Sequence, residues 1–149
     1  MFRYHAPIVM LLALLQPGTG DAGQYIEGPV MAEVVRVIDG DTVLVEAMPW
    51  PDHRINTYVR LRGIDTPELK SSCPAFREAA RKAQDQLKSL MSDQQQVELT
   101  EISGDKYFGR VVATLVLADG RRPAELLLEQ GLAEPYKGNA KTRHDCPSG

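Results

Sequence analysis

The chain has 149 residues, of which 43% are hydrophobic and 25% charged, a composition typical of a globular domain with one core. A collagen, a long coiled coil and a largely disordered chain are thereby excluded. The formal net charge of −3 provides no overall positive field, so an anionic substrate would have to be bound by local basic groups. The two cysteines are too few for a disulfide scaffold and lack the paired CxxC spacing of a zinc site.

The first 22 residues are expected to be a secretory signal peptide. Arg3 precedes an apolar run over residues 6–15, and Gly20 and Ala22 stand at positions typical of a cleavage site. The alternative is an uncleaved anchor, but this run is too short to cross roughly 30 Å of hydrocarbon at about 1.5 Å per residue. Cleavage after Ala22 would leave a single domain, residues 23–149, in a secreted or periplasmic and oxidising location, without stable membrane association.

Three strands are predicted in the first part of this domain. Two β-branched runs within residues 31–46 flank Asp39-Gly40, and this pattern predicts a hairpin because glycine tolerates the positive φ of a tight turn. Residues 48–54 contain two prolines around Trp50 and are expected to be loop. Residues 55–62 alternate between apolar and polar side chains and predict a half-buried strand, with Arg60 and Arg62 on the polar face.

A long helix, two strands and a short helix follow. An apolar stripe over residues 75–91 predicts an amphipathic helix. Residues 97–102 and 110–117 are strand-like, and Pro123 begins a short helix that ends before Gly131. Five strands, with one helix between the third and fourth and a short helix near the C-terminus, are the elements of a mainly β OB-fold, a five-stranded Greek-key barrel.

Three polar motifs occur in order along these elements: DGDT at residues 39–42, RLRGIDTPE at residues 60–68 and DKYFGR at residues 105–110. Each motif alone is a weak signal, since DGDT is mostly hairpin chemistry. All three in this order resemble the thermonuclease family, the staphylococcal-nuclease-like domains, over residues 31–136. Members of that family hydrolyse phosphodiester bonds in DNA and RNA, usually in single-stranded regions.

The resemblance implies a metal site. Asp41 and Asp65 would supply carboxylates to a Ca²⁺ ion, with the backbone carbonyl of Thr66 as a further ligand. Ca²⁺ is a hard cation that takes oxygen ligands in flexible geometry, so this donor set would make an open and rather weak site. Asp41 could instead be a solvated residue leaving the turn, but the second carboxylate at Asp65 favours metal binding. Asp39 is interpreted as a turn former outside the ligand set.

The resemblance also implies catalytic residues. Glu68 would act as general base on the attacking water, and Arg60 and Arg110 would hold the scissile phosphate. A guanidinium suits this task because its planar fork binds two phosphate oxygens at once and stays charged. The alternatives are an exposed loop glutamate and an ordinary strand-edge charge. Arg60 and Arg62 share a strand face, and only the spacing in the family selects Arg60.

Substrate contacts are expected from Lys106, Tyr107 and Tyr136. Aromatic faces accept any base and contribute about 1–3 kcal/mol each by stacking, although turn or core aromatics are an equal alternative. The common family pattern is DKYGR, whereas this chain has an additional Phe108, a lengthening similar to that of secreted bacterial members. The extra residue leaves open which aromatic ring meets a base.

The resemblance to those secreted members extends to the cysteines, which precede the long helix and lie in the tail. It implies a disulfide between Cys73 and Cys146 that would hold the tail to the barrel. We therefore expect a secreted or periplasmic, monomeric, Ca²⁺-dependent nuclease. Two alternatives remain open: a non-catalytic nucleic-acid-binding module of the same fold, and an OB-fold adaptor that binds protein or sugar and uses the metal only for structure.

Overall fold

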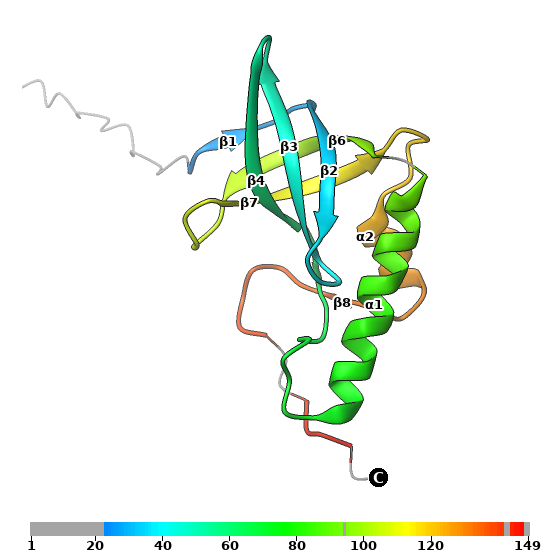
Figure 1. The fold of residues 1–149 in the computed structure, drawn as a ribbon. Coiled ribbons are helices and arrows are strands. Elements are labelled where there is room, and N and C mark those ends of the chain that lie inside the picture. The colour runs from blue at the N-terminus through cyan, green and yellow to red at the C-terminus, as the bar shows by residue number, and fades with distance from the viewer. Residues whose placement is uncertain (1–22, 94, 142–143, 148–149) are drawn as a thin grey trace, which may run out of the picture.

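The computed structural model describes residues 23–93, 95–141 and 144–147, and the predicted signal peptide lies outside them. The strands are β1 (Tyr25–Ile26), β2 (Val30–Val37), β3 (Thr42–Trp50), β4 (His53–Leu61), β5 (Ile64–Asp65), β6 (Gln96–Gly104), β7 (Arg110–Leu117) and β8 (Glu134–Pro135). The helices are α1 (Pro74–Ser92), between β5 and β6, and α2 (Pro123–Glu129), after β7. Figure 1 shows their arrangement.

Five of the strands close into a barrel. They are hydrogen-bonded in the order β6, β2, β3, β4, β7, and the pairing of β6 with β7 closes the ring. The β4–β7 pairing is parallel, and the others in the ring are antiparallel. The predicted five-stranded OB-fold, with one helix between its third and fourth strands and a short C-terminal helix, is confirmed.

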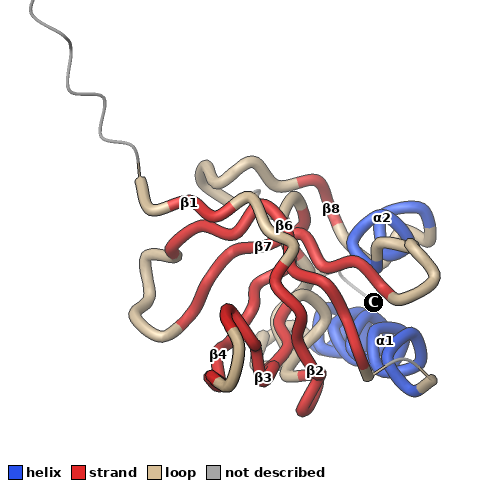
Figure 2. The backbone as a smooth tube through the Cα atoms, turned by 90° about the horizontal axis from the view of Figure 1, so that it is seen from above, coloured by secondary structure: helices blue, strands red, loops and turns tan. Residues whose placement is uncertain are grey.

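The core forms where the barrel interior meets the helices. Alternate side chains of β3 and β4, among them Val45, Val59 and Leu61, point inward and are fully buried. Leu87 of α1 and Leu127 of α2 join the same apolar cluster. Both helices lie along one side of the barrel (Figure 2), so the opposite side is left for other contacts.

The prediction that residues 48–54 form a loop is wrong. β3 continues through Trp50 and β4 begins at His53, so only residues 51–52 form the turn of a long hairpin. Pro49 has no backbone N–H to donate to a neighbouring strand. The strand accommodates it because the register shifts between Ala47 and Trp50, so no hydrogen bond from residue 49 is needed. This hairpin projects beyond the barrel (Figure 1), and Trp50 at its end is 58% exposed.

The tail after α2 is attached to the barrel at two points. β8 pairs with β5, with Asp65 opposite Glu134. Cys146 forms a disulfide with Cys73, whose Cα atom is 5.6 Å away, and the predicted pairing is confirmed. In the described part of the chain no helix combines the length and the apolar character needed to cross a membrane.

Candidate active site

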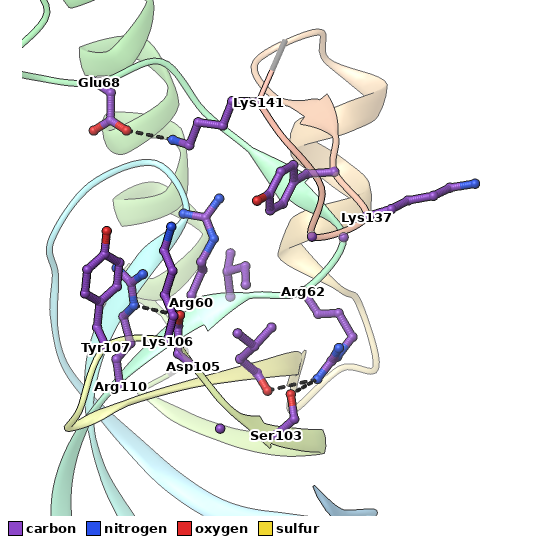
Figure 3. Close-up of a pocket in the computed structure, with 16 residues that line it drawn as sticks. Arg60, Arg62, Glu68, Ser103, Asp105, Lys106, Tyr107, Arg110, Lys137 and Lys141 are labelled. Carbon is purple, nitrogen blue, oxygen red and sulfur yellow. Dashed lines mark hydrogen bonds and ion pairs between the residues drawn. The ribbon is translucent and has the colours of Figure 1, made fainter. Parts of the chain in front are cut away.

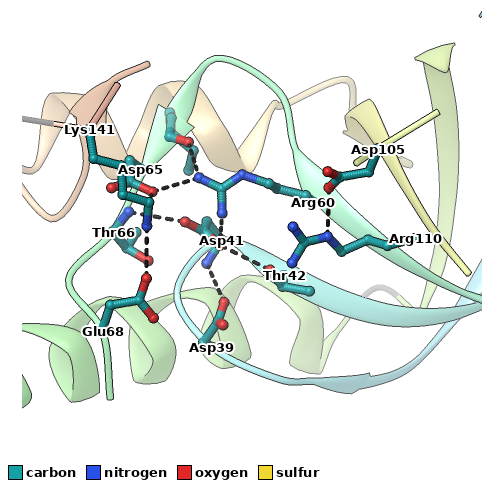
Figure 4. Close-up of polar contacts among 11 residues, drawn as sticks. Asp39, Asp41, Thr42, Arg60, Asp65, Thr66, Glu68, Asp105, Arg110 and Lys141 are labelled. Atoms are coloured by element: carbon teal, nitrogen blue, oxygen red, sulfur yellow. Dashed lines mark hydrogen bonds and ion pairs between the residues drawn. The ribbon is translucent and has the colours of Figure 1, made fainter. Parts of the chain in front are cut away.

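A buried carboxylate lies where the β2–β3 turn meets the barrel. Asp41 is 3% exposed, and both of its carboxylate oxygens accept hydrogen bonds. Its Oδ1 accepts from the Thr42 hydroxyl at 2.9 Å, and its Oδ2 accepts from the Thr66 amide at 3.1 Å. Asp39 accepts a hydrogen bond from the Asp41 amide, which fits its interpretation as a turn residue. The turn and the β5 segment thereby fix the orientation of Asp41 (Figure 4).

Burial controls the protonation of Asp41. The pKa of Asp41 is raised to about 6, chiefly because burial removes the carboxylate from water, an effect that the positive charge of Arg60 only partly offsets. The neighbouring charge of Asp39 raises the pKa further, while the hydrogen bonds from Thr66 and Thr42 lower it. A cation bound at this carboxylate would therefore relieve an unfavourable buried charge.

Arg60 connects the two predicted metal-binding carboxylates. It projects from β4, and its guanidinium lies 3.1 Å from Asp41 Oδ1 and 2.6 Å from Asp65 Oδ1. The same guanidinium donates to the Ile64 carbonyl at 3.3 Å and lies 5.5 Å from the centre of the Tyr136 ring. Burial lowers the pKa of Arg60, but the charges of Asp41 and Asp65 outweigh this and keep the pKa above its ordinary value. Arg60 is consequently a permanent cation at this site.

The donor set fits a hard divalent cation. The Oδ1 atoms of Asp41 and Asp65 converge on one guanidinium, and Asp65 Oδ1 also lies 3.0 Å from the Lys141 ammonium, so the carboxylates already hold cationic groups. Among the described residues no group of three or more His, Cys, Asp and Glu side chains is close enough to hold an ion. Two carboxylates are fewer than such a group, so water would have to supply most of the ligands of an ion bound here.

A second basic group lies on β7, the strand paired with β4. Arg110, at the start of β7, contacts Asp105 through Nε and Oδ2 at 2.6 Å and lies 4.6 Å from the centre of the Tyr107 ring. Partial burial raises the pKa of Asp105, but the hydrogen bond and charge of Arg110 outweigh it and hold the pKa below its ordinary value. Lys106 lies 5.1 Å from the centre of the same ring. The ion pair with Asp105 restrains the Arg110 side chain. The sequence analysis predicted Arg110 but not the role of Asp105.

The additional residue Phe108 extends out of the turn between β6 and β7. Its side chain is fully exposed, whereas Tyr107 lies against Arg110 and Lys106. The turn thus absorbs the lengthening, and the ring of Tyr107 is the one held beside the arginine.

These side chains surround one cavity of about 810 Å³ (Figure 3). Its lining includes six basic and two acidic side chains together with two tyrosines: Arg60, Arg62, Lys106, Arg110, Lys137, Lys141, Glu68, Asp105, Tyr107 and Tyr136. Asp41 and Asp65 are not among the lining residues, but both contact Arg60, which is. A protein of net charge −3 thus has a local basic cavity, as an anionic substrate requires.

Glu68 projects from the segment that follows β5, and its side chain is 68% exposed. Its carboxylate lies 2.8 Å from Lys141 Nζ. Burial lowers the pKa of Lys141, but hydrogen bonds to Glu68 and Asp65 outweigh it and raise the pKa above its ordinary value. Sequence reasoning missed Lys141 because no motif contains it and only the path of the tail brings it here.

Arg62 is separated from Arg60 by the structure. Its guanidinium donates to the Glu101 carbonyl at 2.6 Å, the Ser103 hydroxyl at 2.7 Å and the Val112 carbonyl at 3.1 Å. Glu101 has a positive φ of 51° at a register shift in β6. Arg62 therefore stabilises an irregular part of the barrel wall, and Arg60 is the arginine that contacts the carboxylates.

The fold and the site define an OB-fold barrel that carries paired carboxylates beside an arginine-lined cavity. A family model of staphylococcal nuclease homologues matches residues 58–147, and the chain belongs to that family. The match extends from β4 to the tail, so it includes Arg60, Asp65, Glu68 and Arg110, while Asp41 precedes it. A search of curated proteins found no match. Family membership indicates a nuclease-type domain and nucleic acid as its class of ligand.

Proposed function

We propose that this protein is a Ca²⁺-dependent nuclease that hydrolyses phosphodiester bonds of single-stranded DNA or RNA. The observation that carries the proposal is that Arg60, Glu68 and Arg110 line one basic cavity, with Asp41 and Asp65 in contact with Arg60. We further propose that residues 1–22 direct export and that the mature protein is a monomer. The Cys73–Cys146 disulfide supports an oxidising location.

Each residue has a definite task in this proposal. Arg60 and Arg110 bind the scissile phosphate and stabilise the negative charge that its oxygens gain in the transition state. Glu68 accepts a proton from the attacking water as the water oxygen bonds to phosphorus and the bond to the leaving oxygen breaks, and the leaving oxygen takes a proton from solvent. Asp41, Asp65 and the Thr66 carbonyl would hold Ca²⁺, which would supply further positive charge at the phosphate.

Lys106, Tyr107 and Tyr136 would bind the remainder of the substrate. The two rings lie against arginines on different elements, Tyr107 beside Arg110 and Tyr136 beside Arg60. A ring held in this way is available to stack on a base without losing much conformational freedom. Single-stranded substrates are favoured because stacking requires unpaired bases.

Cleavage of single-stranded DNA tests this function. We expect Ca²⁺-dependent cleavage that stops with chelator, and a fall in kcat of roughly 10²- to 10³-fold for Glu68→Gln and for Arg60→Ala, since each removes a group that acts in the transition state. Glu78→Gln and Arg121→Ala are matched controls, because both side chains form exposed ion pairs away from the cavity. These controls should retain wild-type rates.

Two results would exclude the proposal in favour of its alternatives. Binding of single-stranded DNA without cleavage in Ca²⁺ indicates a non-catalytic nucleic-acid-binding module. Stabilisation by Ca²⁺ with neither binding nor cleavage indicates a barrel that uses the metal for structure and binds protein or sugar.

A further inference from the structure

A lysine of the tail forms ion pairs with two acidic residues of the site. Lys141 Nζ lies 2.8 Å from Glu68 Oε1 and 3.0 Å from Asp65 Oδ1 (Figure 4). The lysine lies 73 residues after Glu68 in sequence, so the contact depends entirely on the tertiary structure. Lys141 also lines the cavity (Figure 3).

The described tail residues 136–141 and 144–146, which we call the strap, are held at two points to the segment that carries the two acids. At the first end β8 pairs with β5, and the Tyr136 amide donates to the Gly63 carbonyl at 2.9 Å. At the second end Cys146 is bonded to Cys73, five residues after Glu68. In sequence, Lys141 therefore lies between the two points at which the strap is attached to residues 63–73.

The contact between the strap and Glu68 is the ion pair with Lys141. In the described part of the chain, Lys141 is the one side chain that forms an ion pair with Glu68. Glu68 and Lys141 are 68% and 45% exposed, and an exposed ion pair contributes too little to hold a free tail in place. The disulfide is the covalent constraint that keeps Lys141 near its partners.

We propose that Lys141 is a positioning residue that directs the Glu68 carboxylate toward the cavity, and that the Cys73–Cys146 disulfide holds Lys141 where it does so. This inference rests on the proposed nuclease function, in which Glu68 acts on water. A carboxylate free to rotate into solvent would spend less time in a productive orientation, and small losses of alignment reduce catalytic rates strongly. The opposite role, in which Lys141 blocks the acids and inhibits, is an outcome of the same experiment.

The first measurement compares cleavage by wild-type protein with Lys141→Ala and Lys141→Arg. We expect Lys141→Ala to lower kcat about tenfold and to leave KM within about twofold, because a positioning role acts after substrate has bound. Lys141→Arg should restore most of kcat, since it keeps the charge. Lys82→Ala is the matched control, because Lys82 forms an exposed ion pair with Glu78 on α1. It should retain wild-type kinetics.

The second measurement is Ca²⁺ affinity by calorimetry without nucleic acid. Lys141 shares Asp65 Oδ1 with any ion bound there, so its removal should tighten Ca²⁺ binding a few-fold, and Lys141→Arg should leave it near wild type. If Lys141→Ala binds Ca²⁺ more tightly than the wild type, weaker metal binding cannot explain slower cleavage. Slower cleavage by this variant would then support the positioning role.

The third measurement uses a variant that lacks the Cys73–Cys146 disulfide. Cys73→Ser/Cys146→Ser, assayed at a temperature where circular dichroism shows it folded, should lose about as much kcat as Lys141→Ala. Adding Lys141→Ala to it should change kcat by less than about twofold, because both changes remove the same contact.

The outcomes separate this inference from the function on which it rests. Wild-type kcat in Lys141→Ala, a rise in kcat, or an effect on KM alone overturns the positioning role while cleavage by the wild type still stands. Wild-type kcat in the double serine variant overturns the role of the disulfide. If the wild type does not cleave, the proposed function fails, and the positioning role is overturned with it.

Discussion

Asp41 carries a charge in surroundings that disfavour it. The side chain is almost fully buried, and its hydrogen bonds with Thr42, Thr66 and Arg60 only partly compensate for lost hydration. Between pH 3.8, its ordinary pKa, and about 6, the folded protein retains a proton that the unfolded chain releases. The stability that Asp41 contributes is therefore complete below the lower value and is lost as the pH rises through the upper one.

This behaviour predicts a pH-dependent difference between wild type and Asp41→Asn in the absence of metal. From pH 4 to pH 7.5 the free energy of unfolding of the wild type should fall relative to that of the variant, by up to about 3 kcal/mol at 1.36 kcal/mol for each pKa unit. Urea unfolding of both proteins in chelator at the two pH values measures the difference. Parallel pH profiles would contradict the assignment of this titration to Asp41.

Arg60 lies in β4 and Arg62 directly follows it, and the sequence pattern does not distinguish the roles of these two arginines. Alternation places Arg60 and Arg62 on one face, and nothing in their spacing distinguishes a site residue from a structural one. The structure separates them because Arg60 reaches two carboxylates, whereas Arg62 bonds to carbonyls of β6 and β7. Their different roles follow from the groups that other strands place opposite each side chain.

At the scale of elements, α1 supports the turn that presents Asp41. Gln84 of α1 donates to the Ile38 carbonyl at 2.7 Å. Gly40 is buried against the same helix, where a Cβ atom would lie 2.7 Å from Ala83 Cβ and 2.9 Å from Thr66 Oγ1. The sequence prediction that Gly40 supplies a positive φ is wrong, since Gly40 is not among the positive-φ residues of the described chain. Glycine is required here because the turn and the helix approach closely.

This packing predicts that Gly40→Ala destabilises the protein by about 1–3 kcal/mol, because the added methyl group forces the turn away from α1 and Thr66. Gly104→Ala is the matched control: its Cβ would meet nothing within 4 Å, and its φ is not positive. Thermal or urea unfolding compares the two variants. Equal stability of both would show that the turn can shift without cost.

At the scale of the whole molecule, the disulfide connects the tail to the start of α1 across a sequence separation of 73 residues. Closing a loop of this length restricts the unfolded chain, a constraint of roughly 4–5 kcal/mol at most. It compensates for a tail whose described side chains are largely exposed.

Export to an oxidising location would both remove the signal peptide and allow the disulfide to form, so the two are tested together. Protein recovered from the periplasm or medium should begin at Gly23, and its thiols should react with an alkylating reagent only after reduction. Reduction should lower the free energy of unfolding by up to about 4 kcal/mol. An N-terminus at Met1, or thiols that react without reduction, would contradict the proposed location.

The five barrel strands, the two helices and the family were predicted correctly from the sequence, because hydrophobic periodicity and short motifs are local properties of the chain. The roles assigned to the site residues stay predictions. The long β3–β4 hairpin was not predicted, since two prolines conceal a register shift that only pairing between strands reveals. Tertiary structure decided which arginine meets the carboxylates, why Gly40 is glycine, and that Lys141 reaches Glu68. These contacts join residues far apart in sequence, and their geometry exists only once the barrel has closed and the tail is anchored.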